Sequence, residues 1–468
     1  MIYSGTRSRL NQASQLSGAP VVSDNTSPRP VLTLDDLAAP MSRRPERLYA
    51  LTPSDLAIAF SQALDLAEGK QPGHAQRVCY IATTLADALG ATPAERAGAF
   101  FGALLHDAGV TTAAAEICRV AGIDEESIFG PSPRQSPEEL RGTLPFADLS
   151  AINEAVHQHP AIGAEIAAAL ELPEEVSAAI RGHHERWDGR GFPSDKQGSQ
   201  ICLEARIVAV ADMAEVIIAG EMNSLAARRR FGQALSPFVG SSLDPEIVAK
   251  LFDVARADSF WLGLYAEDLP EVLSGFRIGI DARKSRGRVL RFAEAFADIS
   301  DAKGGHTAGH SRRTADGAER LAEALALDPG HVEMIRIAAL LHDVGLLGVP
   351  ARVMSKPDIL SVTEMQLMRL HPAHSEMVLQ PMNGFEEVAY WISRHHERPD
   401  GKGYPEMVTG DEIPLESRIL SVADVYAALT SERPHRGALS SKDARQILLG
   451  AGGSQLDPEL ARLFCTLI

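Results

Sequence analysis

The sequence predicts an all-α protein made of two helical bundle domains in tandem. Three observations carry this prediction: a long internal repeat, apolar residues that recur at three- and four-residue steps, and no stretch that alternates convincingly enough to build a sheet. A chain of 468 residues also has room for two or three domains, each with its own core.

The expected order of segments follows from composition and from the limits of the repeat. Residues 1–47 are rich in Ser, Pro, Thr and Arg without a sustained apolar period, which is typical of a flexible tail. We expect a first domain over 48–260, a linker over 261–290 and a second domain over 291–468.

The repeat begins without a gap. When His74 is aligned with His310, "LLHDAG", which ends at Gly109, falls on "LLHDVG", which ends at Gly345. The spacing from the first histidine to the His-Asp pair is 32 residues in both halves. A segment of 24 extra residues then interrupts the first half within Gly122–Pro145.

After this insertion the two halves share a register again. Of the 30 positions in His183–Asp212, 17 are identical to their counterparts in His395–Asp424. The motif "LDPE" closes each copy, at Leu243 and at Leu456. We interpret the halves as two copies of one domain.

Local signals predict where the matched residues lie on helices. The apolar period that follows His74 places this residue in the first turn of a helix. Thr92–Pro93 and Asp328–Pro329 are typical of an N-cap followed by the first helical position. Helices from these starts should deliver the His-Asp pairs at their C-terminal ends, where we expect Gly109 and Gly345 to end them.

Composition excludes some functional classes. Lys and Arg total 45 against 62 Asp and Glu, and the net charge of −17 argues against general nucleic-acid binding. No apolar run is long enough for a membrane span, and the N-terminus lacks a secretory pattern. Four widely spaced cysteines favour reduced thiols and a cytoplasmic location: Cys79, Cys118, Cys202 and Cys465.

Histidines and aspartates carry the chemical signal. Ten of the 15 histidines occupy five repeated positions, and each set includes two repeated aspartates. One interpretation is structural, with these side chains capping helices and bonding loops, but burying so many polar groups is unfavourable without partners. Imidazoles and carboxylates without thiolates suit iron, manganese, nickel or zinc. Paired ions generate a hydroxide and stabilise phosphoryl displacement, so the pattern predicts phosphate-ester hydrolysis.

The His-Asp pair resembles the HD superfamily of metal-dependent phosphohydrolases, and "HHERPDGKGYP" at His395–Pro405 resembles the defining stretch of its HD-GYP family. The likeness continues through "LLHDVGLLGVP", "RLHPAHS" and "QLDPEL", from Gly305 to the end of the chain. The resemblance implies tandem HD-type bundles, the first more divergent. It also implies two or three divalent ions per active domain, iron or manganese, and hydrolysis of cyclic di-GMP or a related cyclic dinucleotide.

Carried over position by position, the resemblance assigns ligands in the second copy. One side of the metal cluster is formed by His310, His342, Asp343 and Asp424. The other side is formed by His371, His395 and His396, with Asp343 bridging. Asp343 is thereby implied in catalysis together with two residues that would hold substrate phosphate or guanine, Arg433 and Arg436.

Two departures from the family pattern affect the second copy. The family usually has a Lys at the position of Leu346 in the second copy and of Val110 in the first copy. The loss of this Lys predicts lower activity or another choice of substrate. His306 precedes His310 by one helical turn, where some relatives place a Glu for a third metal. It is either an additional ligand or an exposed histidine at a helix end.

The first copy keeps the matching ligands but not the arginines. Glu221 and Ser224 stand at the arginine positions, and Glu221 would repel a phosphate. We expect this copy to bind metal, whereas hydrolysis by it stays open. Its predicted ligands are His74, His106, Asp107, His159, His183, His184 and Asp212.

The leading hypothesis is an enzyme that opens cyclic di-GMP by attack of a metal-bound hydroxide on a phosphodiester. A second hypothesis is hydrolysis of another cyclic dinucleotide, such as cyclic GMP-AMP. A third is a signalling module that binds nucleotide or a partner protein without catalysis. The partner classes left open are a second copy of this chain and another signalling protein.

Overall fold

The computed structural model describes residues 50–70, 72–111, 149–219, 224–279, 285–304, 308–356, 358–432 and 437–468. Within these ranges the secondary structure is helical, with two isolated bridges and no strand. The all-α prediction is therefore confirmed. The expected tail over 1–47 and the whole of the predicted insertion lie outside the described residues.

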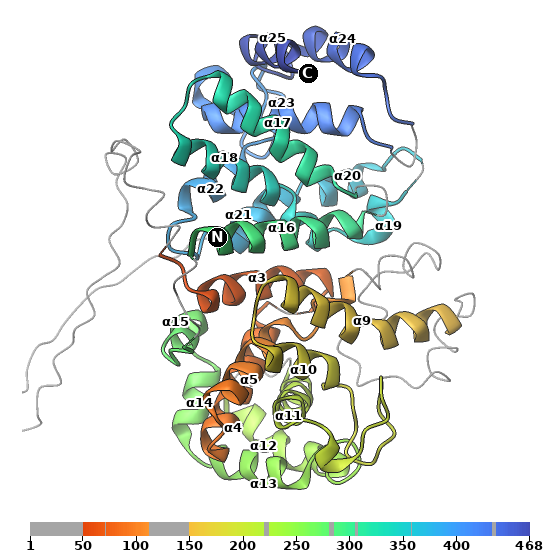
Figure 1. Ribbon diagram of the computed structural model, residues 1–468, viewed down its shortest axis with the longest axis vertical. Coiled ribbons are helices and arrows are strands. Elements are labelled where there is room, and N and C mark those ends of the chain that lie inside the picture. The colour runs from red at the N-terminus through yellow and green to blue at the C-terminus, as the bar shows by residue number, and fades with distance from the viewer. Residues whose placement is uncertain are drawn as a thin grey trace, which may run out of the picture. The chain divides into compact units, whose positions relative to one another are not determined.

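The described parts of the first half, residues 50–279, consist of packed helices (Figure 1). Helix α4 packs against α5 and α11, and α10 packs against α5 and α9. These elements are α3 (Pro53–Ala67), α4 (His74–Leu89), α5 (Pro93–Leu105), α9 (Leu149–Ala169), α10 (Glu174–Gly182), η2 (Gly198–Gln200) and α11 (Leu203–Ile218).

The rest of the first half consists of shorter helices. Helices α14 and α15, most of whose residues fall in the predicted linker, pack against α4. The elements are α12 (Ser224–Leu235), η3 (Ser236–Phe238), α13 (Pro245–Val254), α14 (Asp258–Leu264) and α15 (Leu269–Ser274).

The second half, residues 285–468, has the same kind of packing. Helix α17 packs against α18 and α23, and α21 packs against η5 and α22. The elements are α16 (Ser285–Lys303), α17 (His310–Ala324), α18 (Pro329–Leu341), η5 (Val344–Gly348), α19 (Ala351–Met354), α20 (Val362–Met368), α21 (His371–Leu379), α22 (Glu386–Ser393), η6 (Gly410–Glu412), α23 (Leu415–Leu429), α24 (Ser441–Ala451) and α25 (Pro458–Leu467).

The predicted helix starts are confirmed. The Thr92 hydroxyl accepts a hydrogen bond from the Glu95 backbone N–H, and the Glu95 carboxylate accepts one from the Thr92 N–H. Asp328 caps α18 by accepting from the N–H groups of Gly330 and His331. These bonds satisfy backbone donors that have no partner inside the helix.

The prediction that Gly109 and Gly345 end these helices is wrong. Helix α5 ends at Leu105 and α18 ends at Leu341, before the His-Asp pairs. The glycines are needed for another reason, which is close approach of two backbones. A Cβ on Gly345 would lie 2.0 Å from the His371 carbonyl oxygen.

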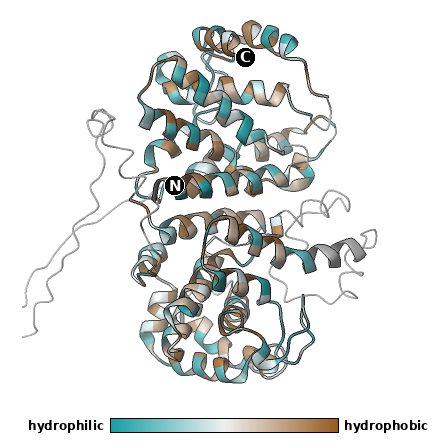
Figure 2. Ribbon diagram, viewed as in Figure 1, coloured by the Kyte–Doolittle hydropathy of each residue, from teal (hydrophilic) through white to brown (hydrophobic). Residues whose placement is uncertain are grey.

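An aromatic contact joins the two halves. Figure 1 shows α3 beside α16, and the ring of Phe60 on α3 stacks on Phe296 of α16 with centroids 4.0 Å apart. Phe292 lies next to this pair, and all three side chains are fully buried. Most helices interleave hydrophobic and hydrophilic residues along their length (Figure 2), as expected for helices with one buried face.

None of the described helices has the length and apolar character needed to cross a bilayer.

Candidate metal centres

The seven ligands predicted in the second half meet at one place, which we call the C-terminal cluster. Two of them begin helices, since His310 is the first residue of α17 and His371 the first of α21. The others follow the ends of α18 and α22, or lie within α23. The complete set is His310, His342, Asp343, His371, His395, His396 and Asp424.

Asp343 directs its two carboxylate oxygens toward different histidines. Oδ2 lies 3.2 Å from Nε2 of His342 and 3.6 Å from Nε2 of His310. Oδ1 lies 3.3 Å from Nε2 of His371 and 3.9 Å from that of His395. This is the arrangement expected of a carboxylate that bridges two ions.

The remaining predicted ligands complete the two sides. Oδ1 of Asp424 lies 3.1 Å from Nε2 of His310, on the His342 side. The ring of His396 lies 4.9 Å from that of His371, centroid to centroid, and 4.0 Å from that of His395. Asp424 thus lies beside His310, and His396 lies beside His371 and His395.

The protonation pattern of the histidines fits a cation. Nδ1–H of His342, His371 and His395 donates to the backbone carbonyl three residues earlier, over 2.7, 2.8 and 2.6 Å. In the neutral ring, Nε2 of each histidine then has a lone pair that faces carboxylate oxygens. Lone pair and carboxylate repel each other unless a cation lies between them, and Nε2 of His342 is buried without a hydrogen bond. The residues present therefore fit divalent ions.

Electrostatics favour the ligand forms of most of these groups. Burial, reinforced by the neighbouring histidines, lowers the pKa of His395 well below its usual value and that of His396 to about 4. Burial works against ionisation of Asp343, but His342 and His371 outweigh it and hold its pKa well below the usual range. Neutral imidazoles and an ionised carboxylate are the forms that bind metal.

His342 is the exception in the metal-free protein. Burial lowers its pKa, but the carboxylates of Asp343 and Asp424 outweigh burial and raise it to about 9. A proton then takes the position that a cation would otherwise hold.

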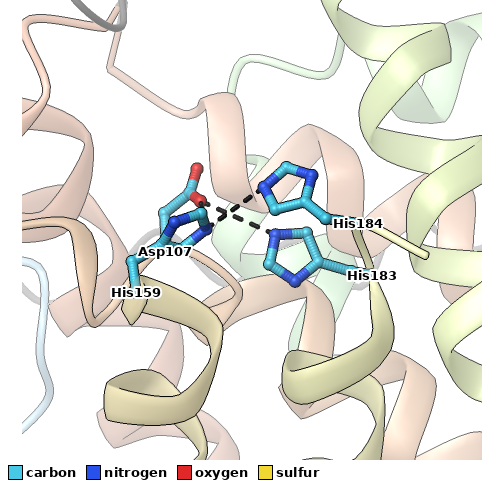
Figure 3. A group of neighbouring side chains, drawn as sticks. All are labelled: Asp107, His159, His183 and His184. Carbon is cyan, nitrogen blue, oxygen red and sulfur yellow. Dashed lines mark hydrogen bonds and ion pairs between the residues drawn. The ribbon is translucent and has the colours of Figure 1, made fainter. Parts of the chain in front are cut away.

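A second group, the N-terminal cluster, gathers the ligands predicted in the first half. Figure 3 shows Asp107, His159, His183 and His184 pointing toward one another. Oδ1 of Asp107 lies 3.7 Å from Nε2 of His159 and 3.9 Å from Nε2 of His183. Nε2 of His184 lies 3.1 Å from Nε2 of His159. The other predicted members of the cluster are His74, His106 and Asp212.

The side of the N-terminal cluster formed by His74, His106 and Asp212 contains a residue that the sequence analysis missed. The Lys70 ammonium lies 2.6 Å from Oδ2 of Asp107 and 3.1 Å from Nε2 of His74. Burial lowers the pKa of Lys70, but Asp107 and Glu68 outweigh it and raise this pKa well above its usual value. A signal was present, because Lys70 stands four residues before His74, at the position that matches His306.

Glu215 was also missed. Nδ1–H of His74 donates to its carboxylate over 2.5 Å, and Arg77 donates to the same carboxylate over 2.7 Å. The matching position in the second half is Ala427, so comparing the two halves could have singled out this buried charge.

Other positions that the sequence singled out lie outside the described residues or are buried apolar side chains. His306, Arg433, Arg436 and Glu221 lie outside the described residues. Leu346, at the position of the family Lys, packs in a buried apolar cluster with Val349 and Val353, and Val110 is also buried. Leu346 and Val110, which stand at the position of the family Lys, are therefore apolar packing positions.

Comparison with known proteins gives consistent results. The HD domain family matches residues 147–242 and 294–460. The 3'3'-cGAMP-specific phosphodiesterase 3 of Vibrio cholerae is 31% identical over 432 residues, which cover 87% of this chain and 92% of that protein. The 3'3'-cGAMP-specific phosphodiesterase 1 of the same organism is 25% identical over 84% of this chain and 86% of its own length.

Other matches cover less of the chain or are structural. The cyclic di-GMP phosphodiesterase response regulator RpfG of Xanthomonas campestris is 38% identical over 37% of this chain and 46% of its own length. The crystal structure of a cyclic GMP-AMP specific phosphodiesterase of V. cholerae, V-cGAP3, superposes with a TM-score of 0.61 at 28% identity. That match covers 88% of this chain and 96% of the other.

Proposed function

The chain belongs to the HD-domain family and is a phosphohydrolase, and from this premise we propose that it hydrolyses a cyclic dinucleotide with divalent metal ions. The observation that carries the proposal is the C-terminal cluster, in which Asp343 faces histidines on both of its sides. Divalent ions would supply Lewis-acid chemistry there, activating water and neutralising phosphate charge.

For the substrate we propose 3'3'-cyclic GMP-AMP first and cyclic di-GMP second. The sequence alone favoured cyclic di-GMP. The relatives that match most of this chain are described as specific for 3'3'-cGAMP, whereas those described for cyclic di-GMP match about a third of it. Support for 3'3'-cyclic GMP-AMP therefore comes from relatives that share both halves.

The residues of the C-terminal cluster would bind two ions. His310, His342 and Asp424 would hold one ion, and His371, His395 and His396 the other, with Asp343 shared. We propose that Arg433 and Arg436 hold the substrate phosphates or a guanine. In support, Arg313 on α17 donates to the Ser431 hydroxyl over 2.9 Å, so Ser431, two positions before Arg433 in the sequence, lies beside the helix that begins with His310.

We further propose that the halves are tandem copies, with domains over 48–260 and 291–468, and that the first copy is the divergent one. Its ligand set supports metal binding, while the lack of the two arginines argues against hydrolysis. A cytoplasmic location is part of the proposal, supported by three free cysteines among the described residues: Cys79, Cys202 and Cys465.

The test is turnover by protein purified without chelators. Metal content is measured first, and the protein is then incubated separately with 3'3'-cyclic GMP-AMP, cyclic di-GMP and cyclic di-AMP. We expect several equivalents of metal, linear products by chromatography, and the fastest turnover with 3'3'-cyclic GMP-AMP. Asp343→Ala should lose both metal and turnover.

Two results would contradict the proposal. A metal-free protein that is fully active would exclude the metal-dependent mechanism. A metal-loaded protein that binds these nucleotides but hydrolyses none would favour the non-catalytic signalling module.

A further inference from the structure

We propose that the Lys70 ammonium takes the place of one metal ion in the N-terminal cluster, so that the first half binds fewer ions than the second. The inference rests on the proposed function in one respect, that these ligand sets bind ions at all. It concerns the side of the cluster formed by His74, His106, Asp107 and Asp212.

The first step is the single lone pair of His74. Its Nδ1–H donates to Glu215, so the lone pair is on Nε2. The Lys70 ammonium, which has only donors, lies 3.1 Å from that Nε2. One lone pair either accepts a hydrogen bond or ligates an ion, and Lys70 already uses it.

The second step is the charge of Asp107. Its Oδ2 lies 2.6 Å from the Lys70 ammonium and 3.0 Å from Nε2 of His106. In the C-terminal cluster the equivalent oxygen of Asp343 faces only histidines among the described residues. A fixed positive charge at Oδ2 opposes a divalent ion at the same oxygen.

The third step is that Lys70 is held where it is. Glu68, at the end of α3, forms an ion pair with it at 2.6 Å and is buried. The matching residue in the second half is Gly304, and Ala427 stands in place of Glu215. The two carboxylates that accompany Lys70 and His74 are thus specific to the first half.

The opposite side of the cluster remains suited to one ion. Oδ1 of Asp107 faces His159 and His183, and His184 lies against His159. Nδ1–H of His183 donates to the Ile180 carbonyl over 2.6 Å, which leaves its Nε2 lone pair facing Asp107. We therefore assign one ion to this half.

The experiment counts ions in the full chain after the C-terminal cluster has been disabled by His342→Ala with Asp343→Ala. Protein is loaded with excess Mn²⁺, desalted and measured by elemental analysis. With Lys70 present we expect about one ion per chain, and with Lys70→Ala about two, because the His74 lone pair and Oδ2 become available. Lys70→Arg should keep the lower count, as should the control Lys196→Ala, which removes an exposed lysine of the same half.

Thermal unfolding gives a second measurement. Mn²⁺ should raise the melting temperature of Lys70→Ala more than that of the chain with Lys70, because the ion replaces the lost positive charge. Two ions with Lys70 present would overturn the inference even if Lys70→Ala did not fold. An unchanged count in folded Lys70→Ala would overturn it as well. Failure of the proposed function would appear separately, as missing metal in the second half and no turnover by the parent chain.

Discussion

At the scale of single residues, Asp343 and Asp107 hold equivalent places but have different neighbours. Asp343 faces histidines with both oxygens, whereas Asp107 gives one oxygen to histidines and the other to Lys70 and His106. A carboxylate neutralised by an ammonium has less charge to offer a metal ion. The same His-Asp pair can therefore serve different purposes in the two halves.

The raised pKa of His342 predicts that metal binding releases a proton. In the metal-free protein this histidine is protonated below pH 9, since its pKa is raised to about 9, but a ligating Nε2 must be neutral. Proton release at this residue should thus be present at pH 8 and lost as the pH rises through 9. Calorimetric titration with metal in two buffers of different ionisation enthalpy measures the number of protons released.

The titration is done in a chain that carries His106→Ala with Asp107→Ala. These changes are needed because the pKa of His106 is also raised to about 9, and its proton release would be measured together with that of His342. Burial lowers the pKa of His106, and Asp107 outweighs burial. Equal proton release at pH 8 and pH 10 would contradict the assignment of His342.

Arg433→Ala should weaken the transition state without removing metal. Losing a charge-assisted phosphate contact costs about 1.5–3 kcal/mol, or roughly one to two powers of ten in kcat/KM. Steady-state kinetics with a metal count on the same sample measures both quantities. Loss of metal together with activity would instead give Arg433 a structural role.

At the scale of elements, one glycine sets how closely α21 approaches the His-Asp pair. The backbone N–H of Gly345 donates to the Ser375 hydroxyl on α21, and that hydroxyl donates to the His342 carbonyl. His371 at the start of α21 is held against η5 in this way. Gly109 has the same relation to His159, with 2.1 Å between a built Cβ and the carbonyl oxygen.

Gly345→Ala should displace α21 and weaken the ion on the His371 side. The added Cβ would lie 2.0 Å from one backbone oxygen and 2.5 Å from the Ser375 nitrogen, so the helix must move. Such overpacking costs about 1–3 kcal/mol of stability, and misplacing a ligand costs about 10–100-fold in metal affinity. Metal titration and thermal unfolding measure the two effects.

The control for this change is Gly450→Ala on α24, where no atom lies within 4 Å of the built Cβ. It should leave metal affinity unchanged and leave stability equal or slightly higher. If Gly345→Ala behaved like Gly450→Ala, the close approach would not position His371.

At the scale of the whole molecule, α3 connects the two clusters. It packs against α16, η5 and α21 of the second half, and its C-terminal end leads to Glu68 and Lys70. The Lys303 ammonium on α16 donates to the carbonyls of Ala67 and Leu347, one from each half. Helix α3 therefore connects the N-terminal cluster, through direct packing, to the residues that follow Asp343.

Two double variants separate the halves. His342→Ala with Asp343→Ala should lower turnover by about three powers of ten or more, because metal ions supply several kcal/mol of transition-state stabilisation. His106→Ala with Asp107→Ala should keep much of the turnover and change its regulation through α3. Initial rates at saturating substrate measure both. If the first-half variant were the inactive one, hydrolysis would belong to the first half.

The sequence by itself determined the helical fold and singled out the candidate ligands. Helix caps such as Thr92 and Asp328 depend on residues within a few positions, and the repeat marked histidines and aspartates at equal spacing. These are local signals, which need no knowledge of the packing.

Only the tertiary structure decided which side chains surround these candidate ligands. Lys70 meets Asp107 across 37 positions of the chain, and Glu215 meets His74 across 141, so no local pattern could pair them. The role of Gly345 likewise depends on α21, which begins at His371. The charge around each cluster is set by such distant contacts, because electrostatic interactions act through space and depend on burial.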